Sequence, residues 1–229
     1  GFFYKAEKYY TNSLNIYEKE LGTEHIYIAA ILNQLGSLFE KLGKYKVAIK
    51  YFNKSFNIRR NISDDQSPQL AYIYGRIATM HTRLKKFGAA IKLYNKSLEI
   101  YRTHHLYGKN SKRLGITLAN LAAVYLGLGN YIRSEKLLLR SKEIFENSDN
   151  KNWLMEIYYH LGVINDYRGE NDLALKYFNK AINIGKEYPD VIKNNVTKIL
   201  EALGKKYYEI RDYEKAEKYY NESLSFFKK

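Results

Sequence analysis

The stretch LGKKYYEIRDYEKAEKYYNESL, residues 203–224, decides the fold, because weaker copies of it recur along the chain. It contains a small residue within a helix, a polar break, an aromatic residue, an alanine and a second aromatic residue. Aligning the chain on the alanine of the pattern aromatic-x-x-Ala gives six copies at intervals of 42, 42, 44, 40 and 42 residues. The aligned positions are Ala6, Ala48, Ala90, Ser134, Ala174 and Ala216.

Four further positions agree between the copies. Three residues before the alanine stand Phe3, Tyr45, Phe87, Tyr131, Asn171 and Tyr213. Four residues after it stand Tyr10, Phe52, Tyr94, Leu138, Phe178 and Tyr220, and seven after it Ser13, Ser55, Ser97, Ser141, Ala181 and Ser223. Twelve residues before it, from the second copy on, stand Gly36, Ala78, Ala122, Gly162 and Gly204. Spacings of three, four and seven place side chains on one helix face, so each copy predicts two helices, with aromatic rings packed beside small residues.

This pattern resembles the tetratricopeptide repeat over essentially the whole chain. The common form has a period of about 34 residues, and the longer period here is similar to that of kinesin light chains. The segment 21–52 carries this likeness, with Leu-Asn-Gln-Leu at 32–35 in place of their Leu-Asn-Asn-Leu. The resemblance implies an all-α fold, an α-solenoid that forms a right-handed superhelix of about five and a half helix–turn–helix repeats with a concave side.

We expect residues 1–229 to form one domain. The repeats are predicted as a half repeat at 1–22 and full repeats at about 23–66, 67–109, 110–149, 150–188 and 189–229. Because the chain begins inside the pattern, we expect a fragment of a longer protein. Thr23 is predicted as one helix N-cap, and Ser67 followed by Pro68 as another. Glycines 43, 129 and 169 are predicted helix C-termini, where Lys85 and Arg211 replace glycine in two copies.

Composition limits the classes of function. The chain has 38 Lys and Arg against 24 Asp and Glu, a formal net charge of +14, and no cysteine. No apolar run is long enough for a membrane span and no signal segment opens the chain, so we predict a cytoplasmic protein. The lysines are scattered, which favours solvated helix faces over a nucleic-acid surface. No phosphate-binding loop, HExxH or GxSxG motif occurs, so we predict no enzyme, no cofactor and no metal.

The resemblance also implies where ligands bind. In this family the first helix of each repeat lines the concave groove, at positions just before and after its small residue. The candidate peptide-binding residues are Asn33, Gln34, Ser37, Tyr72, Arg76, Thr79, Arg83, Asn120, Tyr159, His160 and Tyr167. Two residues before successive small residues come Gln34, Arg76, Asn120 and His160, a row of hydrogen-bonding groups that could satisfy an extended peptide backbone.

Several functions stay open at this stage. The first is a scaffold that binds a peptide or partner segment, neutral to acidic because of Arg76 and Arg83. The second is the peptide-sensing part of a larger signalling or transcriptional regulator. Nucleic-acid binding is the weakest of the three, and the lysine–asparagine–arginine clamp of chaperone-tail binders is missing from any three successive repeats. Phe226 and Phe227 suggest self-association through the terminal repeats.

Overall fold

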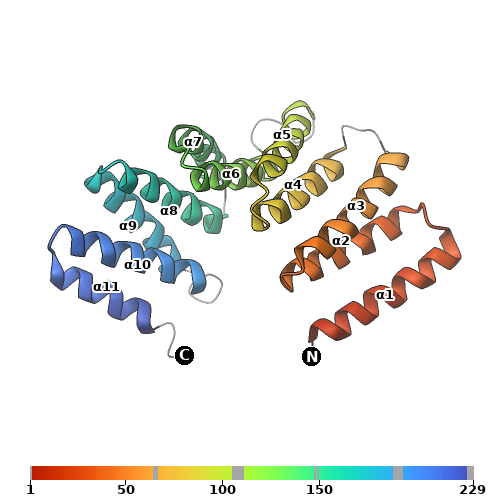
Figure 1. Ribbon diagram of the computed structural model, residues 1–229, viewed down its shortest axis with the longest axis horizontal. Coiled ribbons are helices and arrows are strands. Elements are labelled where there is room, and N and C mark those ends of the chain that lie inside the picture. The colour runs from red at the N-terminus through yellow and green to blue at the C-terminus, as the bar shows by residue number, and fades with distance from the viewer. Residues whose placement is uncertain are drawn as a thin grey trace. The chain divides into compact units, whose positions relative to one another are not determined.

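The protein is an array of helix pairs. The computed structural model describes residues 2–63, 67–104, 111–146, 148, 150–187 and 193–225, which contain helices and turns but no strand. The helices (Figure 1) are α1 (Phe2–Leu21), α2 (Ile26–Lys41), α3 (Tyr45–Ile62), α4 (Pro68–Arg83), α5 (Phe87–Thr103), α6 (Lys112–Gly127), α7 (Tyr131–Glu146), α8 (Lys151–Tyr167), α9 (Asn171–Glu187), α10 (Lys193–Glu209) and α11 (Tyr213–Ser225). The predicted all-α solenoid is confirmed.

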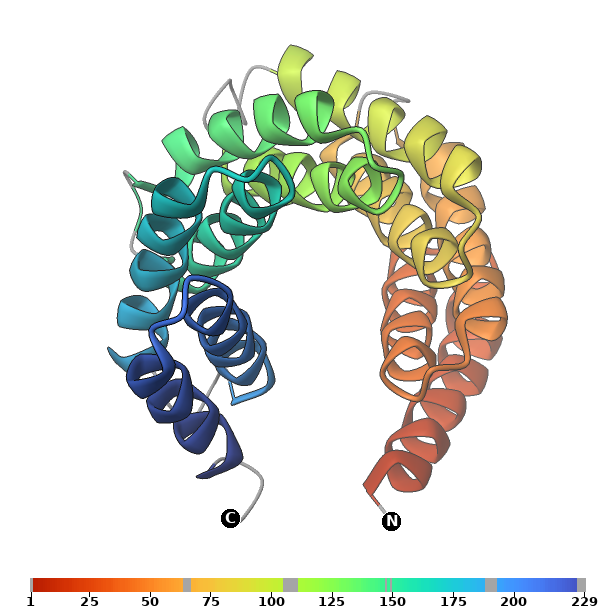
Figure 2. The same ribbon diagram turned by 60° about the vertical axis from the view of Figure 1, so that its left-hand side comes forward.

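The chain divides into two compact units. Unit 1 is Gly1–Val124, and unit 2 is Tyr125–Lys229. In unit 1, α2 packs against α1 and α3, and α4 packs against α3 and α5; in unit 2, α8 packs against α7 and α9, and α10 against α9 and α11. Within each unit the even-numbered helices lie in one layer and the odd-numbered helices in a second layer (Figure 2). The even-numbered helices are the first helices of the repeats, and the odd-numbered ones are the second helices.

Close contacts between a glycine and an aromatic ring join the first helix to the second helix in three of the repeats. A Cβ atom added to Gly36 would lie 2.8 Å from the Phe52 ring, and one added to Gly162 would lie 2.6 Å from the Phe178 ring. Both rings are buried. The last repeat has the same arrangement, with Tyr220 at 2.9 Å from a Cβ placed on Gly204. The two helix backbones approach this closely because no methyl group stands between them, so the ring fills the space and buries a large apolar area.

The serine seven residues after the aligned alanine adds a polar link in the first full repeat. Ser55 is fully buried on α3, and its hydroxyl donates a hydrogen bond of 2.7 Å to the backbone carbonyl of Ala29 on α2. A buried hydroxyl without a partner would cost free energy, so this bond allows a polar side chain at the contact between two helices.

The turn inside each pair has one conformation. The residues two positions after the first helix have positive φ angles: Gly43 71°, Lys85 57°, Gly129 72°, Gly169 76° and Arg211 66°. Around Gly43, its own N–H donates to the Glu40 carbonyl and the next N–H, of Lys44, donates to the Phe39 carbonyl, which is the pattern of a Schellman motif. The predicted glycine C-termini are confirmed. Lys85 and Arg211 adopt the same left-handed conformation, which costs a residue with a side chain about 1–2 kcal/mol.

Two predicted N-caps have different outcomes. Thr23 is not a cap, because α2 begins later, and the Nδ1 atom of His25 accepts a hydrogen bond of 3.3 Å from Tyr27 N. Ser67 is the N-cap of α4 and Pro68 lies in its first turn, as predicted. The Ser67 hydroxyl donates to the side-chain oxygen of Gln69 and does not cap a backbone N–H. The suggested contact residues Phe226 and Phe227 lie outside the described part of the chain.

Adding one methyl group at the small-residue contact should destabilise the protein. We predict that Gly162→Ala lowers the free energy of unfolding by about 1–3 kcal/mol, because the Phe178 ring must move. The matched control is Gly88→Ala on α5, where an added Cβ meets no atom within 4 Å; it should be neutral or stabilising by up to about 1 kcal/mol. Urea unfolding followed by circular dichroism measures both, and equal effects would contradict the packing account.

Placing glycine at a position that has the left-handed conformation should stabilise the protein. We predict that Lys85→Gly raises the free energy of unfolding by about 1 kcal/mol, because glycine adopts positive φ without steric cost. The reciprocal variant Gly43→Lys places a side chain on the same position of the preceding repeat and should cost a similar amount. If both variants shift the urea midpoint in the same direction, the turn geometry described above is wrong.

Candidate functional site

Arg76 on α4 is the centre of a polar cluster on the first-helix layer of unit 1. Its Nη2 atom donates a hydrogen bond of 3.1 Å to Ser37 Oγ and is paired with the carboxylate of Glu40, both on α2. Its guanidinium carbon lies 5.4 Å from the centre of the Phe52 ring and 5.8 Å from that of Tyr72. Arg76 therefore links two repeats and has its charge balanced inside the protein.

Two buried polar atoms of this cluster have no hydrogen-bond partner. They are Asn33 Oδ1 on α2 and Arg76 Nε on α4. The Ser37 hydroxyl donates to the Asn33 backbone carbonyl at 3.0 Å, which leaves the side-chain oxygen of Asn33 unused. Buried polar groups in folded proteins are nearly always hydrogen-bonded, so these two atoms are exceptions, and their lack of accessible surface keeps a ligand from pairing with them unless the side chains around them move.

The other candidates of unit 1 fall into two groups. Tyr72 has a second guanidinium near its ring, that of Arg113 on α6, at 5.2 Å. The Thr79 hydroxyl is used internally, donating to the Gly75 carbonyl at 3.0 Å and lying 2.9 Å from the Tyr94 hydroxyl. Gln34 and Arg83 are exposed, and Asn120 is partly exposed. These last three side chains are available to a ligand.

Tyr159 and His160 form a second cluster, in unit 2. Both are on α8, their ring centres are 5.5 Å apart, and Tyr159 lies 6.0 Å from Phe178. Burial, followed by the nearby charge of Lys198, lowers the pKa of His160 to about 4. Burial, followed by the charge of Glu201, raises the pKa of Tyr159. At neutral pH His160 is therefore uncharged and can offer one hydrogen-bond donor and one acceptor.

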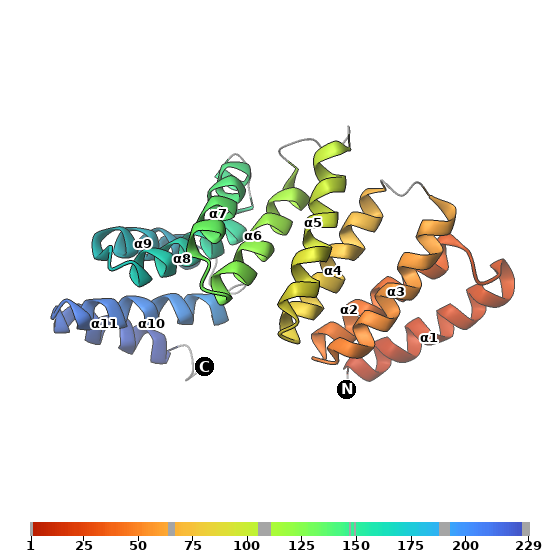
Figure 3. The same ribbon diagram turned by 45° about the horizontal axis from the view of Figure 1, so that its top comes forward.

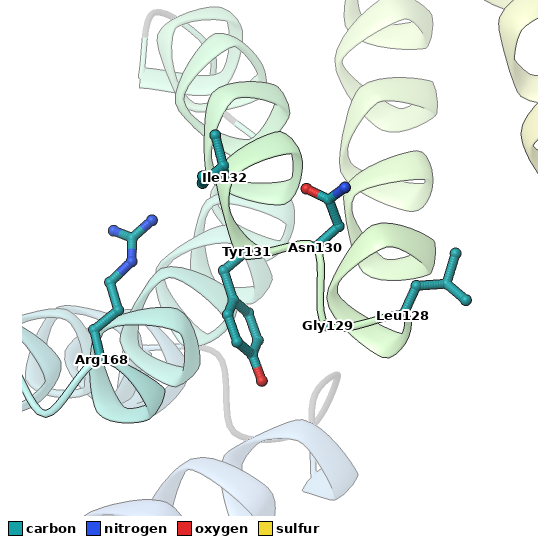
Figure 4. A pocket seen from close by; sticks show the side chains of 6 residues that line it. All are labelled: Leu128, Gly129, Asn130, Tyr131, Ile132 and Arg168. Carbon is teal, nitrogen blue, oxygen red and sulfur yellow. The ribbon is translucent and has the colours of Figure 1, made fainter.

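Tyr167 is not part of that cluster. It is 68% exposed at the end of α8 and stacks on Tyr131 of α7, with ring centres 5.2 Å apart. Tyr131 lines an open depression of about 410 Å³ (Figure 4), together with Leu128, Gly129, Asn130, Ile132 and Arg168. The guanidinium of Arg168 already donates to Glu135 at 2.8 Å, so the depression has no free charged group among its lining residues.

Sequence reasoning missed the ion pairs between successive first helices. In unit 2, Lys206 on α10 is paired with Asp166 on α8 and lies 2.6 Å from Glu209, with its side chain only 6% exposed. Burial lowers the pKa of Lys206, but the two carboxylates outweigh this effect and raise it overall. Asp166 and Glu40 occupy the same position, four residues after the small residue, so an acid there followed by a base in the next repeat was the available signal.

Two kinds of site are missing from the described residues. No group of three or more His, Asp or Glu residues in that part of the chain could hold a metal ion. No helix of the same part is both long enough and apolar enough to cross a membrane.

Comparison with known proteins identifies the family. A family model described as "Tetratricopeptide repeat" matches residues 1–61, 27–103 and 113–187, so the chain belongs to the tetratricopeptide repeat family. Proteins built from this repeat are typically scaffolds for protein interaction, and that general role applies to this chain. The search of curated proteins gave no match.

Solved structures agree with this fold. BtubC (BKLC) from P. vanneervenii is 19% identical with a TM-score of 0.79, covering 98% of this chain and 90% of that chain. Aspartyl phosphate phosphatase F from Bacillus subtilis is 18% identical with a TM-score of 0.74, covering 91% of this chain and 53% of that chain. A putative kinesin light chain with nearly identical repeats, from Podosopora anserina, is 12% identical with a TM-score of 0.68, covering 88% of this chain and 96% of that chain. At these identities the likeness establishes the fold alone.

The lowered pKa of His160 predicts a loss of stability in mild acid. The unfolded chain binds a proton on this histidine near its ordinary pKa of 6.5, whereas the folded chain binds it near 4, so stability falls as the pH drops through this window. At pH 4.5 the loss should be about 2 kcal/mol relative to pH 7. Urea unfolding of the parent and of His160→Gln at both pH values tests this. Between pH 7 and pH 4.5 the free energy of unfolding of the variant should fall by about 2 kcal/mol less than that of the parent. An identical pH dependence of the two proteins would contradict the lowered pKa of His160.

Proposed function

We propose that the protein binds an extended peptide segment of a partner protein on the first-helix layer of unit 1. The observation that carries the proposal is the pair of accessible amides on first helices, Gln34 on α2 and Asn120 on α6, which stand before and after the Arg76 helix. Each amide is both a hydrogen-bond donor and an acceptor. A peptide backbone offers both complementary groups at every residue, so it suits this pair without requiring a particular side chain.

The side chains beside these amides fit the same kind of ligand. Tyr72, held between two guanidinium groups, offers an aromatic surface beside them. We infer a ligand of neutral to acidic character, because Arg83 is an exposed cation whereas the charge of Arg76 is already balanced by Glu40.

Unit 2 could hold a ligand in the same manner through Tyr159 and His160. Neutral His160 would act as both donor and acceptor there, as the amides do in unit 1. The role of a peptide-sensing regulator, the cytoplasmic location and self-association remain predictions from the sequence, and no contact among the described residues favours them over the scaffold.

A peptide library displayed on phage and panned against the folded chain tests the proposal. Enriched peptides should bind the double variant Gln34→Ala with Asn120→Ala about tenfold more weakly than the parent, because two of the amides that pair with the ligand backbone are gone. Fluorescence anisotropy with the labelled peptide measures the dissociation constants. Arg76 is left intact, because its removal would leave Glu40 unpaired.

The matched control replaces two exposed asparagines of the second helices, Asn53 on α3 and Asn95 on α5, by alanine. This variant should bind the selected peptides as the parent does. The proposal is wrong if panning enriches no peptide, or if both double variants bind with the affinity of the parent.

A further inference from the structure

The positive charge of the protein is concentrated in unit 1. Residues 1–124 contain 20 Lys and Arg against 8 Asp and Glu, a net charge of +12. Residues 125–229 contain 18 against 16, a net charge of +2. A general surplus of lysine would affect both units alike, so the difference points to a local cause in unit 1.

Part of this charge gathers at one end of unit 1. The turn between α2 and α3 and the turn between α4 and α5 lie at the same end of the unit (Figure 3). Packing of α3 against α4 holds these two turns as neighbours, and the pairing of Arg76, in the middle of α4, with Glu40, near the end of α2, links the same two repeats. We call this region the basic turn surface. It consists of the exposed side chains Lys41, Lys44, Lys46, Arg83, Lys85 and Lys86.

Few acidic groups oppose these six cations. Of the acids at this end of the unit, Glu40 is already paired with Arg76, and Glu7 on α1 is partly exposed. The helix α3 itself has five basic residues and no acidic residue. Burial lowers the pKa of His81 on α4, and the positive charge of Lys86 lowers it further. The potential around these six side chains is therefore positive.

The helix N-termini at the two turns add to the positive potential. Lys44 and Lys86 stand at the N-cap positions of α3 and α5, form no side-chain cap bond, and no acidic residue follows in the first turn. Unit 2 differs, because Asn130 Oδ1 accepts from Arg133 N at 3.1 Å at the start of α7. The first N–H groups of α3 and α5 thus lack the side-chain acceptor that a carboxylate could provide.

We propose that the basic turn surface docks an acidic segment of a partner protein. Clustered glutamate or aspartate carboxylates would pair with the six cations and with the N–H groups at the starts of α3 and α5. Single-stranded nucleic acid fits less well, because it binds through basic grooves with exposed aromatic rings on which bases stack. Of the exposed tyrosines of unit 1, Tyr27 lies at the opposite end, at the start of α2, and Tyr4 and Tyr9 belong to α1 and not to the two turns that carry the six cations. The surface shares Arg83 with the proposed peptide site, but the two tests replace no residue in common, so each proposal can fail without the other.

The test uses the full chain and a fluorescein-labelled peptide of alternating glutamate and serine, read by fluorescence anisotropy. The triple variant Lys41→Gln, Lys46→Gln and Lys86→Gln should weaken binding by about tenfold, because half of the cationic side chains of the surface are removed. The matched control removes the same charge from exposed lysines of unit 2: Lys136→Gln, Lys176→Gln and Lys218→Gln. It should change the affinity by less than about twofold.

Two further probes complete the design. A peptide of alternating glutamine and serine should not bind measurably, and circular dichroism should show all variants folded alike. Equal weakening by both triple variants would overturn the proposal, since binding would then follow net charge alone. A single-stranded oligothymidylate of equal charge that binds more tightly than the acidic peptide would overturn it in favour of a nucleic-acid partner.

Discussion

The contact between a small residue of the first helix and an aromatic ring of the second is the constraint on which the structure depends. Gly36 with Phe52, and Gly162 with Phe178, leave no space for a methyl group. Once this contact forms, the spacing of the two helices is determined, and the Schellman turn after the first helix directs the chain back along it. Every later feature uses the helix pairs that this contact creates.

The chemistry available for binding is what this packing leaves unused. Arg76 and Lys206 are both charged residues of first helices. Each forms an ion pair with an acid of the preceding first helix, Arg76 with Glu40 and Lys206 with Asp166. Such pairs fasten neighbouring repeats to each other, and removing one partner would leave a poorly solvated charge behind. In the proposed peptide site, the groups left for a ligand are therefore amides, neutral His160, aromatic rings and the exposed Arg83.

Repetition explains how much of the molecule could be predicted from the sequence. Six copies of one pattern predicted the helices, the close contacts and the left-handed turns, because these depend on residues within one copy. The partner of Arg76 could not be predicted in the same way. Arg76 meets Glu40 in the preceding repeat, so this pairing depends on the geometry between repeats. The uneven charge of the two units was readable from the sequence, but only once their boundary was known.

Native-state hydrogen exchange of the full chain tests the central claim, that the small-residue contacts hold the fold together. The account predicts that the slowest amides lie beside Gly36, Gly162 and Gly204, and that they open only with the unfolding of their helix pair. The amides of α1, whose main packing partner among the described helices is α2, should exchange much faster. Amides beside the three glycines that exchange as fast as those of α1 would contradict the claim.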